Sequence, residues 1–236
     1  MENNVSLFII HTIFIMRKII SLLIVLATPA LLHAQAPYAC VTKGATLEYA
    51  NYNEADKLQG YTRQDIKEVS DLSGGNYELR IENSKVKKPG KKKAGKNPYL
   101  TVNEIRQGCV HAFPMDSDGM VNVIEGGEAF LLPNTLAVGY QLPIGDVRLD
   151  TGGVSSVATV TENEVIGREE VTTPAGTFKC YVLKQTMSSS LMGISGMVST
   201  TKSWYCRGVG IVKSETMMSN RLMHREVLVT FKTNAK

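Results

Sequence analysis

The sequence contains few of the residues and none of the common motifs that perform catalysis. It has four histidines in 236 residues, and only His111 and His224 lie beyond the amino-terminal segment 1–34. It has no Gly-x-Ser-x-Gly elbow, no phosphate-binding glycine loop and no His-Glu-x-x-His motif. A lone histidine in a strand-like context is more often packed or solvated than catalytic. We therefore expect no catalytic residue and no enzyme.

Patterns that hold metals or cofactors are also missing. No two of the four cysteines are two to four residues apart, and histidines do not flank them at ligand spacing on both sides. No glycine-rich nucleotide fingerprint is present. We expect neither a metal nor a cofactor.

Only the amino terminus contains a long hydrophobic run, at residues 19–32. Arg17 and Lys18 come directly before this run, and the small residue Ala34 follows it. A positive start, an apolar stretch and a small residue are typical of a secretory signal peptide. The sequence therefore predicts a signal peptide over 1–34, with cleavage after Ala34.

Met16 is the expected true start, because a signal that begins there has an ordinary length. The alternative is an uncleaved anchor over 5–32, which would place Arg17 and Lys18 in the bilayer centre at about 2.5–3.5 kcal/mol each. No later stretch is long and apolar enough to cross a membrane. We expect the mature chain, 35–236, in the periplasm or at the cell exterior.

The basic character of the mature chain lies in one block, residues 85–98. Its lysines are Lys85, Lys87, Lys88, Lys91, Lys92, Lys93 and Lys96. Proline and glycine interrupt the block, which predicts a solvated loop between two strands. The alternative is a contact with an anionic partner, such as lipopolysaccharide or a phospholipid surface. The block has no aromatic residue for base stacking, which argues against nucleic acid.

The rest of the chain has the pattern of a mainly β protein. Short strand-like stretches alternate with glycine, proline and asparagine, and no long amphipathic helix stands out. The expected strands are 45–52, 59–69, 76–83, 99–105, 109–113, 129–132, 147–149, 154–161, 165–172, 177–187, 198–206, 210–217 and 222–232. The stretch 115–127 is irregular, with room for a helical turn. We expect one β-rich domain over 35–236, built as a curved antiparallel sheet or partial barrel.

Four cysteines remain in the mature chain, and an even number in an exported protein favours disulfide bonds. Four cysteines allow three different pairings. The pairing that we expect joins Cys180 to Cys206 and leaves Cys40 with Cys109. The second bond would tie the amino-terminal segment to the sheet.

A predicted hairpin supports the first of these bonds. If the strands on either side of Gly193 pair symmetrically, Val182 faces Trp204 and Cys180 faces Cys206. Facing residues of adjacent strands are close enough for a disulfide.

Four segments carry a family resemblance. They are 47–52, 136–143, 171–181, which contains the turn Pro174-Ala175-Gly176, and 204–215. In this order they resemble the TapB-like proteins, exported Gram-negative proteins of unknown function, some with a YmcC-like fold. The family usually has Ala-Pro where this chain has Cys206-Arg207. The resemblance implies a curved antiparallel sheet, similar in outline to periplasmic lipoprotein carriers, and it implies no reaction.

Two kinds of function remain open. The first is a non-enzymatic binding or carrier module for an apolar ligand or a client protein, with Trp204 and Tyr205 as a candidate ligand face. The methionine-rich last third would suit such a site, although both aromatics and methionines also suit a sheet core. The alternative is a structural or protein-interaction component of the envelope. A hydrolase comes third.

Overall fold

The computed structural model describes residues 35–90, 96–111, 121–151, 153–191 and 194–233. The predicted signal peptide at 1–34 therefore lies outside the described residues. Residues Ala34–Lys236 form one compact unit, and the description below concerns this unit.

Its described part contains thirteen strands and one short 3-10 helix. The strands are β1 (Thr46–Asn53), β2 (Leu58–Asp71), β3 (Tyr77–Val86), β4 (Lys96–Ile105), β5 (Val110–His111), β6 (Val121–Glu125), β7 (Leu131–Leu132), β8 (Gly145–Thr151), β9 (Val154–Thr173), β10 (Gly176–Leu191), β11 (Ile194–Cys206), β12 (Gly210–Met218) and β13 (Arg221–Lys232). The 3-10 helix η1 spans Gly127–Phe130.

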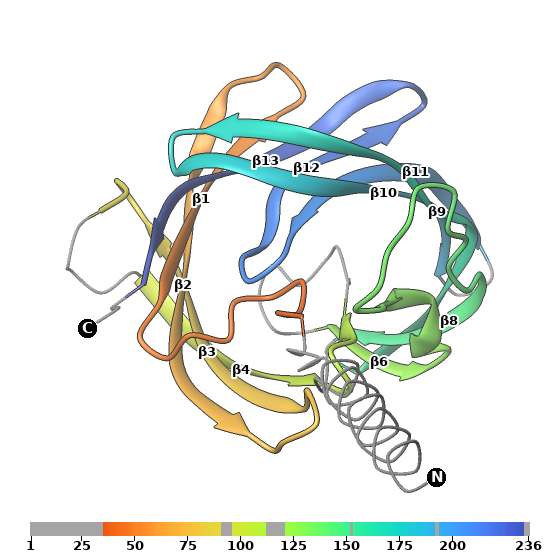
Figure 1. Cartoon of the computed structure of the whole chain (residues 1–236). Helices are drawn as coiled ribbons and strands as arrows, with labels where there is room; N and C mark the ends of the chain where they lie inside the picture. The colour runs from red at the N-terminus through yellow and green to blue at the C-terminus, as the bar shows by residue number, and fades with distance from the viewer. Residues whose placement is uncertain (1–34, 91–95, 112–120, 152, 192–193, 234–236) are drawn as a thin grey trace, which may run out of the picture. The chain divides into compact units, whose positions relative to one another are not determined.

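Eleven of these strands form one antiparallel sheet, in the order β4-β3-β2-β1-β13-β12-β11-β10-β9-β8-β6. The pairing of β1 with β13 joins the first strand to the last. Strands β5 and β7 form a separate two-stranded sheet. Figure 1 shows the large sheet bending through a wide arc, with the segment before β1 and the segment between β7 and β8 inside the arc. The expected mainly β fold with a curved antiparallel sheet is confirmed.

Register shifts explain much of the curvature. The ladders of β10 with β9 shift at Val182/Leu183 and at Thr186/Met187, and several other ladders contain one shift each, such as the β2–β3 ladder at Ile66/Glu68. A β-bulge bends its strand and increases the local twist. The sequence predicts two strands at 154–161 and 165–172, but β9 runs through both of them as one bulged strand.

The hairpin of β10 and β11 has the predicted register, with Val182 opposite Trp204. The predicted strand at 129–132 is wrong in its first half. Gly126 adopts a positive φ of 77° and η1 follows it, so the chain turns there and buries Ala129 and Phe130. Only Leu131–Leu132 is a strand.

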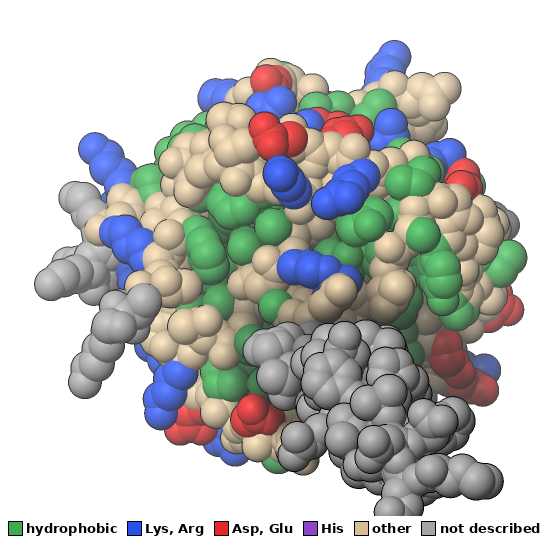
Figure 2. All heavy atoms as spheres, in the orientation of Figure 1, with side chains coloured by type: hydrophobic (Ala, Val, Ile, Leu, Met, Phe, Trp, Pro, Cys, Tyr) green, Lys and Arg blue, Asp and Glu red, His purple; other side chains and the backbone are tan. Residues whose placement is uncertain are grey.

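The larger hydrophobic core lies against the inner face of the arc. Central strands contribute Leu47, Tyr49, Val212 and Leu228, which are at most 5% exposed. Tyr38 and Cys40 from the segment before β1, and Leu136 and Leu142 from the segment after β7, pack into the same cluster. A smaller core joins η1 to β8, β9 and β10. In Figure 2, hydrophobic side chains gather in the middle of the face in view and charged side chains lie mainly around them.

Candidate functional site

The inner face of the sheet changes from apolar to polar along its central strands. On β1, the buried Tyr49 is followed on the same face by Asn51, because alternate residues of a strand share a face. On β13, Leu228 is followed in the same way by Glu226. We call the apolar part, which is covered by the core, the apolar half, and the part beyond it the polar half.

Two rows of paired residues define the polar half. Directly paired residues of neighbouring strands lie on the same face. The first row is Asn51, Glu226, Ser214 and Ser203. The second row is Asn53, His224, Thr216, Thr201, Gln185 and Asn163. These ten residues are named the inner polar strip.

Glu226 is the one acidic residue of the strip. Thr62 of β2 donates a hydrogen bond from Oγ1 to Glu226 Oε1 at 3.4 Å, and Asn51 Nδ2 donates to Thr62 Oγ1 at 3.4 Å. Among the described residues, no Lys, Arg or His forms an ion pair with Glu226. Burial raises the pKa of its carboxyl to about 7, although the hydrogen bond from Thr62 acts in the opposite direction.

His224 lies two residues from Glu226 and faces the same side. His224 is an exposed residue, but partial desolvation of its imidazole lowers its pKa. The imidazole is therefore mostly neutral at pH 7 and supplies little positive charge to Glu226. Beside it in the second row, the hydroxyls of Thr201 and Thr216 share a hydrogen bond of 3.1 Å.

One end of the strip is anchored to η1. Asn163 Nδ2 donates to the carbonyl oxygens of Ala129 at 2.8 Å and Pro143 at 2.9 Å. Gln185 Nε2 donates to the same carbonyl of Ala129 at 3.2 Å. Asn163 and Gln185 are 1% and 5% exposed, so they fix η1 and the segment between β7 and β8, and leave the middle of the strip as its accessible part.

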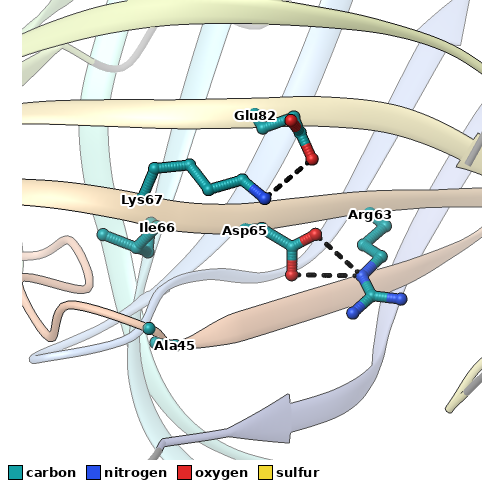
Figure 3. A pocket seen from close by; sticks show the side chains of 7 residues that line it. Ala45, Arg63, Asp65, Ile66, Lys67 and Glu82 are labelled. Atoms are coloured by element: carbon teal, nitrogen blue, oxygen red, sulfur yellow. Dashed lines mark hydrogen bonds and ion pairs between the residues drawn. The ribbon is translucent and has the colours of Figure 1, made fainter. Parts of the chain in front are cut away.

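A separate pocket of about 290 Å³ lies beside β2. Figure 3 shows that its charged side chains pair with one another. Arg63 Nε lies 3.0 Å from Asp65 Oδ2, and Lys67 Nζ lies 2.8 Å from Glu82 Oε1. Because these opposite charges neutralise each other, the pocket offers little net attraction to a charged ligand.

The predicted disulfide bonds are not formed, since all four cysteines are free thiols in the structure. The thiol of Cys180 donates to the carbonyl of Phe178 at 3.7 Å, and that of Cys206 donates to the carbonyl of Arg207 at 3.6 Å. These two thiols also contact each other. Cys40 is buried and interacts with Thr42, and Cys109 is also a free thiol.

Trp204 and Tyr205 do not share one surface. They are 6% and 3% exposed, and as neighbours on β11 they point to opposite faces. The Trp204 indole Nε1 donates to Glu169 Oε2 at 2.7 Å, and Lys213 Nζ lies 4.4 Å from the ring centre. Neither aromatic side chain offers an open surface, and their role as a ligand face stays a prediction.

The lysine block is only partly described. Lys85 and Lys96 are paired residues of β3 and β4, while Lys87 and Lys88 are exposed in the connection. Gly90 donates its backbone N–H to the buried Glu48 Oε2 at 2.6 Å. Residues 91–95 lie outside the described residues, and contact with an anionic surface stays a prediction.

The remaining predictions concern His111 and possible metal ligands. His111 lies in β5, paired with Leu131, far along the chain from His224. Within the described ranges, no three His, Cys, Asp or Glu side chains converge as metal ligands would. The helices of this same part include none that is long and apolar enough to span a membrane.

Sequence reasoning missed Glu226 and the inner polar strip. The sequence Leu222-Met223-His224-Arg225-Glu226 predicts a strand, but the pattern does not show which face turns inward. A usable signal was the recurrence of serine and threonine at alternate positions in 199–203 and 214–216. Such positions pack into an apolar core only if they are hydrogen-bonded.

Comparisons with known proteins agree with this fold. A model of the DUF3108-like family matches residues 42–228. A predicted exported protein with a YmcC-like fold from Bacteroides fragilis is similar in structure, with a TM-score of 0.64 and 20% identity over 84% of this chain and 100% of that chain. A predicted lipoprotein from Parabacteroides distasonis gives a TM-score of 0.65 and 20% identity over 84% of this chain and 99% of that chain.

None of the curated proteins matches the chain. At 20% identity the two crystal structures show the fold alone, and the first of them confirms the YmcC-like fold expected from the resemblance to TapB-like proteins. The family model covers most of the sequence. The chain therefore belongs to the DUF3108-like family.

Proposed function

We propose that the protein is exported to the envelope and acts there as a non-enzymatic binding module, with its ligand held on the polar half of the inner face. Export is supported by the predicted signal peptide and by the descriptions of the two structural relatives. The observation that carries the binding role is the inner polar strip. Its middle residues Asn51, Thr201, Ser214, Thr216 and Glu226 all keep part of their surface exposed.

The packing of the apolar half favours a polar ligand over an apolar one. Tyr38, Leu136 and Leu142 cover the apolar inner residues and are at most 6% exposed. The larger core is therefore filled by the chain's own side chains. Hydroxyl and amide groups remain accessible beyond it, and such groups bind ligands mainly by hydrogen bonds.

The strip also brings His224 and Glu226 near hydroxyl groups, which is the composition of a hydrolase site. Nucleophilic catalysis needs a base hydrogen-bonded to the nucleophile and a third group that orients the base. Among the described residues, His224 makes no hydrogen bond to Ser214, Thr216 or Glu226. This geometry supports a binding site more than a catalytic one.

Native mass spectrometry of the mature protein, purified from its own envelope, tests the binding role. We expect a reproducible bound mass in the wild type. The double variant Thr201→Val and Thr216→Val, which replaces two inner hydroxyls by methyl groups of similar size, should lose it. Thr230→Val is the matched control, because Thr230 pairs with Glu48 beyond the register shift at Glu48/Tyr49 and lies outside the inner polar strip. A bare protein mass in the wild type, or equal occupancy in the double variant, would contradict the proposal.

A further inference from the structure

Glu226 occupies a position in which a carboxylate has few ways to be stabilised. The side chains that face it are Tyr49 and Asn51 of β1, Thr62 of β2 and Ser214 of β12. The other titratable groups on this part of the face are His224, which is mostly neutral at pH 7, and Lys85, which pairs with Thr62 in the β2–β3 ladder. In the described structure, neither contacts the carboxylate.

The hydrogen-bond directions show what is left for a ligand. Asn51 Nδ2 donates to Thr62 Oγ1 and to the Tyr49 carbonyl, at 3.4 and 3.5 Å. The Thr62 hydroxyl in turn donates to Glu226 Oε1. The Asn51 and Thr62 donors are thus used within the cluster. The acceptors Glu226 Oε2, Asn51 Oδ1 and Ser214 Oγ have no donor among the described residues.

A group with several donors and a positive charge complements these acceptors. We propose that Glu226 anchors the ammonium group of a hydroxyl-bearing amine, such as an amino sugar, with Asn51 and Ser214 accepting its other N–H bonds. An ammonium group carries three donors and no acceptor, and its hydrogen bond to a carboxylate is charge-assisted. This inference rests on the proposed binding function and names the chemical class of its ligand.

A metal ion fits the same cluster poorly. Hard cations take six or more oxygen ligands, usually including several carboxylates, and the cluster offers one carboxylate with an amide and a hydroxyl. Burial of an unpaired carboxylate is unfavourable, and a bound ammonium group would remove that penalty. Because the ligand binds the ionised form, binding near pH 7 should release protons from Glu226, whose pKa is about 7 in the free protein.

Calorimetric titration with glucosamine at pH 7 tests the inference, with N-acetylglucosamine as the neutral probe. We expect glucosamine to bind the wild type about tenfold or more tightly than N-acetylglucosamine, and to release protons, seen as a dependence of the binding heat on the buffer. Glu226→Gln should abolish both the preference and the proton release. Glu215→Gln is the control, since Glu215 lies opposite Arg225 in the β12–β13 ladder, forms an ion pair with Lys213 and faces away from Glu226.

Equal binding of the two sugars, or a preference for glucosamine that survives in Glu226→Gln, would overturn the ammonium site. The native mass spectrum could instead show a ligand without an amine that is lost in the Thr201→Val and Thr216→Val double variant. That result would overturn the ammonium site and leave the proposed function intact. Absence of any ligand in that spectrum, together with no binding of either sugar, would remove both proposals. Carbon-13 titration of the Glu226 carboxyl adds a direct readout, since glucosamine should lower its pKa.

Discussion

The two halves of the inner face lie on the same strands but differ in side-chain polarity and in how far they are covered. In the apolar half, the segment before β1 covers Leu47, Tyr49 and Leu228, and the side chains exclude water. In the polar half, the same strands present Asn51 and Glu226, which remain partly accessible. The first half holds the fold together by burial of apolar surface. We expect the second to contribute less to stability, which leaves its polar groups available for the proposed ligand.

Removal of a side chain from the apolar half should have the largest effect on stability. Leu228 is completely buried, and we expect Leu228→Ala to lower the free energy of unfolding by about 2–5 kcal/mol. Thr216→Ala in the polar half should lower it by about 1 kcal/mol or less, for the hydrogen bond to Thr201. Urea unfolding followed by the fluorescence of Trp204, the single tryptophan, measures both. Similar losses in the two variants would refute the division into halves.

Arg207 holds the segments that cover the apolar half, and its removal should have the next largest effect on stability. Its Nη1 donates to the Ala36 carbonyl at 2.9 Å and to Asn134 Oδ1 at 2.7 Å, and its Nη2 donates to the Asn134 carbonyl. The guanidinium also lies 4.4 Å from the centre of the Tyr38 ring. We expect Arg207→Ala to lower the free energy of unfolding by about 1–3 kcal/mol and to speed proteolysis within residues 35–45.

The control for this variant is Arg106→Ala. Arg106 is 71% exposed and pairs with Glu104 on the surface, where an ion pair contributes about 0–1 kcal/mol. Its removal should leave the rate of proteolysis at 35–45 unchanged. An equal effect of the two variants would mean that Arg207 does not hold the segment.

The polar half should give the stability a pH dependence that the apolar half lacks. The pKa of Glu226 rises from its ordinary value of 4.5 to about 7 on folding, so its contribution to stability is fully present below pH 4.5 and is lost as pH rises through 7. His224, whose pKa is lowered by desolvation, acts in the opposite direction over an overlapping range. We expect the free energy of unfolding of Glu226→Gln, relative to wild type, to increase from pH 5 to pH 8.

Urea unfolding of the two proteins at several pH values measures this difference, and His224→Asn separates the histidine contribution. If Glu226→Gln shows the same pH profile as wild type, Glu226 titrates normally and the polar half does not desolvate it.

The sequence predicted the apolar half much better than the polar half. Hydrophobic alternation and turn residues located most strands, and the hairpin argument gave the pairing of Val182 with Trp204. The polar strip could not be predicted in the same way, because polar residues at alternate strand positions are equally typical of a solvent-exposed face. Its inward position depends on the register shifts and on the pairing of β1 with β13, residues that are far apart in the chain. The predicted disulfides were wrong although the hairpin register was right.

The reactivity of the four thiols compares the two halves of the inner face without a substitution that would change stability. Burial raises the pKa of Cys40, and contact with Cys206 together with burial raises that of Cys180, while the contact with Cys180 lowers the pKa of Cys206. Because the thiolate is the reactive form, iodoacetamide should modify the partly exposed Cys206 and Cys109 first, and Cys40 and Cys180 only when the apolar half opens. Mass spectrometry of samples alkylated over a urea series measures the order. Reaction of Cys40 before Cys206 in native buffer would show that the apolar half is open, and fewer than four modified thiols in the unfolded, unreduced chain would show a disulfide that the structure lacks.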